Sequence, residues 1–128
     1  MAPREADPTV ANARLAKAHQ FAEAASLLFD ERSRSTSHPD AYVTNAVHAG
    51  IAAADAICIR ILGKHSANAA HQEAVSLLKL ADPKLATHLS RLLALKTRAG
   101  YSAVTVSTAD VNQARRAHLA LLEAAQDL

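Results

Sequence analysis

The chain has 128 residues, half of them hydrophobic, so it is long enough to bury the core of one domain. Its 14 basic and 12 acidic residues nearly balance, which excludes a strongly basic surface for nucleic acid. The single Cys58 excludes an intramolecular disulfide and fits a reducing compartment. The start of the chain lacks an apolar signal region, and we expect no membrane-spanning segment. We predict one cytoplasmic domain over residues 1–128, with residues 1–14 expected to fray at the N-terminus.

The first two predicted helices have clear start and stop signals. Asp7-Pro8 is a capping residue followed by a proline suited to a first helical turn, and the apolar pattern then continues to a polar cluster at 30–37. The apolar residues at helical spacing are Leu15, Ala18, Ala22, Ala25 and Phe29. A long apolar helix is predicted over 39–62, and Gly63 ends it because glycine readily adopts the left-handed conformation.

The 39–62 helix carries an unusual polar stripe. Thr44, His48 and Asp55 project within roughly 40° of each other on a helix, so they share one side. The opposite side is wholly apolar, with Val43, Val47, Gly50, Ala54, Ile57 and Ile61. We therefore expect this helix at the centre of a bundle, with its polar groups enclosed by protein. A buried Asp55 needs a partner, so Asp55→Ala is expected to cost roughly 3 to 5 kcal/mol.

Three more helices follow in the sequence. Ser66 or Asn68 can cap the third, Asp82-Pro83 starts the fourth, and Gly100 ends it. Ser107 to Asp110 is a variant of the capping box that starts the last helix. The residues at helical spacing, apolar except for His118, are Ala70, Ala74, Leu77, Leu78 and Ala81; Leu85, Leu89, Leu92 and Leu93; and Val111, Ala114, His118, Leu121, Leu122 and Ala125.

These elements predict an all-α, mostly antiparallel bundle of four to five helices. The only strand-like run, 103–106, is too short to carry a sheet. Strips of small residues also invite close packing between subunits, so we expect a symmetric homodimer. The strips are Ala49, Ala52, Ala53 and Ala56 in the 39–62 helix and Ala117, Ala120 and Ala124 in the last helix.

Three segments resemble the HEPN superfamily, small helical bundles named for higher eukaryote and prokaryote nucleotide binding. They are His48-Ala-Gly-Ile-Ala-Ala-Ala-Asp55-Ala, His71-Gln-Glu-Ala-Val-Ser-Leu-Leu and Leu95-Lys-Thr-Arg98-Ala-Gly-Tyr101. The resemblance covers roughly residues 15–126 and implies an HEPN-like antiparallel bundle. Ribonucleases of this family place a histidine after an arginine with four to six residues between the two, in a composite dimer site. After Arg98, the corresponding positions 103–105 are Ala, Val and Thr, so the resemblance implies a branch without nuclease activity.

Four residues are candidates for a ligand site: His48, Asp55, Arg98 and Tyr101. The structural interpretation makes Asp55 and Arg98 a buried ion pair, His48 a satisfied core histidine and Tyr101 a packed ring. The functional interpretation brings them together to hold an anionic ligand through Arg98. We also expect His118 to be a core or interface group. Catalytic residues, a metal site and a cofactor are not predicted, because the histidine spacing and glycine content fit neither zinc nor a phosphate-binding loop.

The leading functional hypothesis is a non-catalytic HEPN-like binding module. By analogy, its protein partner belongs to a toxin–antitoxin or nucleotidyltransferase pair. The alternatives are a divergent ribonuclease that takes its histidine, His48 or His118, from across a dimer, and a small-ligand-binding helical protein. Nucleic acid or nucleotide is a weakly supported partner, and a membrane is not expected.

Overall fold

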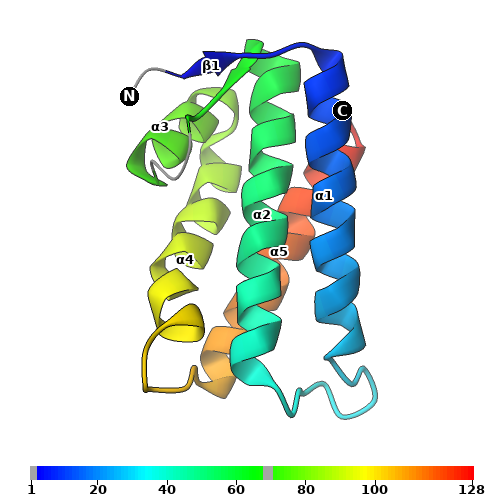
Figure 1. Cartoon of the computed structure of the whole chain (residues 1–128), viewed down its shortest axis with the longest axis vertical. Coiled ribbons are helices and arrows are strands. Elements are labelled where there is room, and N and C mark those ends of the chain that lie inside the picture. Colours follow the sequence, from blue (N-terminus) through cyan, green and yellow to red (C-terminus); the bar gives the residue numbers. More distant parts are fainter. Residues whose placement is uncertain (1–2, 68–70) are drawn as a thin grey trace.

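Five helices and a pair of two-residue strands form the described part of the chain, residues 3–67 and 71–128 of a computed structural model (Figure 1). In order they are β1 (Arg4–Glu5), α1 (Pro8–Leu27), α2 (Pro39–Leu62), β2 (Lys64–His65), α3 (His71–Ala81), α4 (Pro83–Gly100) and α5 (Thr108–Gln126). The predicted all-α helical bundle is confirmed. The antiparallel β1–β2 pair was not predicted, because two residues are too few to produce an alternating pattern.

The helices begin and end where the local sequence signals place them. The carboxylates of Asp7 and Asp82 accept hydrogen bonds from backbone N–H groups in the first turns of α1 and α4. Gly63 ends α2 in the left-handed conformation, with φ of 74°. Ser107 and Asp110 form the predicted capping box of α5, in which each side chain accepts a hydrogen bond from the other residue's backbone.

Some predicted boundaries differ from the structure or lie outside its description. The α1 helix ends at Leu27, before Phe29, because the chain turns at residues 30–35. The first turns of α1 include residues 8–14 of the segment expected to fray. The proposed cap Asn68 and the apolar position Ala70 lie outside the described residues.

Helix α2 lies at the centre of the bundle, as predicted. It packs against α1, α4 and α5 and also contacts α3. Figure 1 shows α1 and α4 on the two sides of α2, with α5 behind it and the four long helices running alternately up and down. One side of α2 therefore faces outward between α1 and α4.

Large aliphatic side chains and alanines share the core. The largest fully buried side chains are Ile57, Leu78, Leu89, Leu92, Leu121, Val43 and Val47. The alanine strip of α2, which was assigned to a dimer interface, is also buried inside the chain: Ala49, Ala52, Ala53 and Ala56. This strip is therefore unavailable for a dimer interface, because its small residues let the neighbouring helices of the same subunit approach closely, and the strip of the last helix is the other face expected to form one. The homodimer itself stays a prediction.

One described helix, α2, is long and apolar enough to cross a membrane when judged by length and composition alone. The expectation that the chain has no membrane-spanning segment stays a prediction. Most of α2 is buried against other helices of the same chain, which accounts for its apolar composition.

Candidate functional site

The polar stripe of α2 runs along the outward side of the helix. Thr44, His48, Ile51 and Asp55 are all partly exposed on this side, and we name these four residues the polar face. The opposite apolar stripe is buried except for its last residue, Ile61. The expectation that protein encloses the polar groups holds in large part for Asp55, whose side chain is 14% exposed, whereas Thr44 and His48 remain partly open to solvent.

The ring of His48 lies against an aromatic ring of α1. Its imidazole stacks on Phe21 of α1, with ring centroids 5.1 Å apart and an interplanar angle of 30°. Partial burial lowers the pKa of His48, and the positive charge of Lys96 on α4 lowers it further. His48 is therefore a neutral imidazole near neutral pH, able to donate from one ring nitrogen and accept at the other.

Asp55 pairs with Arg14 of α1, and not with Arg98 as predicted from the sequence. Its Oδ2 lies 3.9 Å from Nε of Arg14 on α1, and its side chain is 14% exposed. Burial raises the pKa of Asp55 to about 6, because desolvation outweighs the favourable charges of Arg14 and His65. The predicted ion pair between Asp55 and Arg98 is absent from this arrangement.

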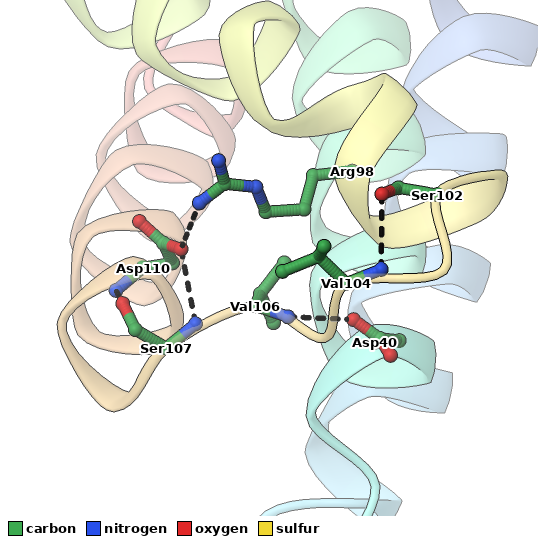
Figure 2. Close-up of polar contacts among 7 residues, drawn as sticks. All are labelled: Asp40, Arg98, Ser102, Val104, Val106, Ser107 and Asp110. Atoms are coloured by element: carbon green, nitrogen blue, oxygen red, sulfur yellow. Dashed lines mark hydrogen bonds and ion pairs between the residues drawn. The ribbon is translucent and has the colours of Figure 1, made fainter.

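Arg98 and Tyr101 lie at the connection between α4 and α5. Arg98 Nη1 is 3.8 Å from Oδ2 of Asp110, the residue that completes the α5 capping box (Figure 2). The Arg98 side chain is 54% exposed, so this pair is a surface ion pair. Tyr101 is 82% exposed, so the expectation that its ring packs against the protein was wrong.

The predicted ligand site therefore separates into two places. The α4–α5 connection lies beside the start of α2, where Asp40 Oδ1 accepts a hydrogen bond of 3.0 Å from the backbone N–H of Val106 (Figure 2). Asp55 lies about 22 Å farther along α2, at 1.5 Å per residue. His48 and Asp55 share the polar face, whereas Arg98 and Tyr101 do not reach it.

The residues that sequence reasoning missed come from neighbouring helices. Phe21 and Arg14 of α1 contact the polar face, and the positive charge of Lys96 on α4 lowers the pKa of His48. Lys96 Nζ is also 3.2 Å from Nε2 of His71 on α3. The sequence contains no signal for these contacts, because each joins residues at least 25 positions apart.

His118 belongs to the core on another side of the bundle, as expected for a core or interface group. It is 2% exposed, its Nδ1 donates to the carbonyl of Ala114 at 2.9 Å, and its ring meets the edge of Tyr42. Burial lowers the pKa of His118, so its imidazole is neutral. The nearby Arg115 pairs with both carboxylate oxygens of Glu31, at 3.0 Å each.

The fold and its exposed polar face define an all-α bundle with a partly open central helix. No protein-family model matches the chain, and no curated protein is significantly similar to it. Because one fold can serve many functions, the function of this chain has to be inferred from the side chains that the fold brings together.

Proposed function

We propose that the chain is a non-catalytic, HEPN-like binding module whose partner docks on the polar face of α2. The observation that carries this proposal is the outward placement of Thr44, His48 and Asp55 on the central helix. If the stripe between α1 and α4 were apolar, the bundle could pack more closely around it. The stripe carries polar groups instead, and such groups are suited to contact with a ligand or partner.

The surroundings of Arg98 support the non-catalytic part of the proposal. Arg98 pairs with Asp110 of α5 and lies in the last turn of α4, where a cation complements the helix dipole, so it has structural contacts at this connection. Positions 103–105, where the family's ribonucleases would carry a histidine, hold the exposed residues Ala103, Val104 and Thr105. An imidazole is therefore missing from the sequence position where proton transfer would occur.

The partner class is proposed by analogy with the HEPN resemblance. A toxin–antitoxin or nucleotidyltransferase partner would place a complementary surface against the polar face. Of the two histidines considered for a divergent ribonuclease, His118 is 2% exposed and donates from Nδ1 to the backbone. His118 is therefore a poor candidate for that role, which leaves His48 of the polar face as the histidine that a divergent ribonuclease would use.

The purified protein is expected not to degrade RNA above background. Single-stranded and structured RNAs should be incubated with wild type, Arg98→Ala and His48→Ala, and the products resolved by gel electrophoresis. A contaminating nuclease would cleave equally in all three samples. Cleavage by wild type that either substitution abolishes would contradict the non-catalytic proposal and favour a divergent ribonuclease.

A further inference from the structure

A small cavity lies where α1, α2 and α5 meet the loop between α1 and α2. Its volume is about 50 Å³, and its polar lining comes from Ser26, Glu31, Tyr42, Arg115 and His118. Its apolar lining comes from Ala22, Phe29 and Leu119. The cavity opens to solvent beside Glu31, whose side chain is 66% exposed. None of the lining residues belongs to the polar face, so the cavity is a separate place on the molecule.

Four of the lining side chains contact one another in turn. The guanidinium of Arg115 lies over Phe29, 4.8 Å from the ring centroid. Phe29 packs on Tyr42 with centroids 5.3 Å apart, and Tyr42 meets the edge of His118 at 6.0 Å. Arg115 and His118 are three residues apart on α5, so they are neighbours on that helix. The cavity therefore has a cation at its more open end, where Arg115 is 22% exposed, and two polar rings at its buried end.

The two polar rings each carry an atom without a partner among residues 3–67 and 71–128, although both residues are only 2% exposed. His118 Nδ1 donates to the backbone, so Nε2 of the neutral ring remains as an acceptor. The Tyr42 hydroxyl keeps its proton at neutral pH, because burial raises its pKa to about 12. Neither atom is fully enclosed, since the enclosed side-chain atom without a partner in this part of the chain is His88 Nδ1. Buried polar atoms normally have partners, so these two atoms suit a ligand.

Arg115 keeps N–H groups that Glu31 does not use. Both hydrogen bonds to Glu31, at 3.0 Å each, come from Nη2 of Arg115. Nε and Nη1 have no partner among the described residues. A guanidinium binds a planar carboxylate through paired N–H groups, and a partly buried charge is screened less by water than an exposed one.

We propose that this cavity binds a hydroxycarboxylic acid of about two or three carbons. The carboxylate of the acid lies against Arg115 at the open end. The hydroxyl accepts from Tyr42 and donates to Nε2 of His118 at the buried end. A hydroxyl is required there because Nε2 can only accept, and a second carboxylate oxygen would face another acceptor. The ligand is small because a cavity that holds benzene measures about 150 Å³.

Glycolate, the smallest acid of this class, is the probe for the test. Protein labelled with ¹³C-tyrosine should be titrated with sodium glycolate at constant ionic strength near neutral pH, and the ring signals followed by NMR. The chain has two tyrosines, so Tyr101→Phe assigns both signals. The Tyr42 signal is expected to shift and saturate. The signal of Tyr101, which is exposed and does not line the cavity, should stay in place.

Two analogues of glycolate test which groups the cavity recognises. Acetate lacks the hydroxyl and should bind roughly fivefold more weakly or worse, because Nε2 of His118 then has no donor. Glycolamide keeps the hydroxyl but carries no charge, so it should cause no saturating shift. Absent saturation by glycolate, equal affinity for glycolate and acetate, or saturation by glycolamide would each overturn the proposal.

Three variants test the position of the carboxylate. Arg115→Met should weaken glycolate binding roughly tenfold or more, whereas Arg116→Met, at the adjacent exposed arginine, should not. Glu31→Gln should tighten binding, because it removes a negative charge that repels the ligand. If circular dichroism shows that Arg115→Met is unfolded, Arg115→Lys replaces it and should also weaken binding, since lysine lacks the planar N–H pair.

Unchanged affinity in the folded Arg115 variant, or affinity that is not raised in Glu31→Gln, would overturn the proposal. Either result leaves the proposed function of the polar face unaffected, because the two places share no residue.

Discussion

Replacing Gly50 with valine is expected to lower the free energy of unfolding by about 3 kcal/mol. A Cβ atom at Gly50 would collide with Cδ1 of Leu92 and approach Cδ1 of Leu121 to 3.3 Å. Both leucines are fully buried, so neither can move into solvent. Valine adds two further methyl groups at the contact between α2, α4 and α5. Urea denaturation monitored by circular dichroism measures the change.

Two matched variants separate this overpacking from a general effect of losing glycine. Gly100→Ala at the end of α4 meets no atom within 4 Å, so its stability should be unchanged or slightly raised. Shortening Leu92 should make room at Gly50, so Gly50→Ala with Leu92→Ala should lose less stability than the two single changes combined. A Gly50→Val protein as stable as wild type would contradict the packing of α2 at the bundle centre.

Replacing Asp55 with asparagine is expected to raise the free energy of unfolding at about pH 8, by up to about 3 kcal/mol. Burial raises the pKa of Asp55 to about 6 in the folded protein from its ordinary value of 3.8. The contribution of Asp55 to the free energy of unfolding is therefore fully present below the pKa that Asp55 has in the unfolded chain. This contribution is lost as the pH rises through the folded-state pKa of about 6. Asparagine avoids the charge, so its advantage should disappear by about pH 4.

This expectation reverses the sign predicted for Asp55 from sequence. A fully enclosed ion pair would make removal of Asp55 costly, but Arg14 is 38% exposed and water can solvate it once its partner is gone. Chemical denaturation of wild type and Asp55→Asn at both pH values provides the measurement. Glu123→Gln is the control, because Glu123 is exposed and should show no such pH dependence. A large loss of stability in Asp55→Asn at the higher pH would show that the ionised carboxylate stabilises the fold.

The helix boundaries could be predicted because short sequence signals determine them. An aspartate before a proline begins α1 and α4, a left-handed glycine ends α2, and the Ser107–Asp110 box begins α5. Each signal acts within four residues, so tertiary structure is not needed to recognise it. The central position of α2 followed from its long apolar stripe in the same way.

The environment of the polar face could not be predicted, because it depends on neighbouring helices. A polar stripe on a mostly apolar helix has the same sequence pattern whether it faces the core or the space between two flanking helices. The partner of Asp55 depends on the position of α1, which brings Arg14 and not Arg98 to it. The Lys96–His71 contact likewise depends on how α3 packs on α4.

Thiol labelling of native protein distinguishes an open polar face of α2 from one that neighbouring helices cover. Thr44→Cys places a thiol on the polar face, Val47→Cys places one on the buried side of the same helix, and the native Cys58 is buried. Native protein should be treated with a maleimide and the modification counted by mass spectrometry. We expect rapid labelling of Thr44→Cys, with wild type and Val47→Cys protected until unfolding. Protection of Thr44→Cys equal to that of Val47→Cys, at protein concentrations low enough to exclude self-association, would contradict an open polar face.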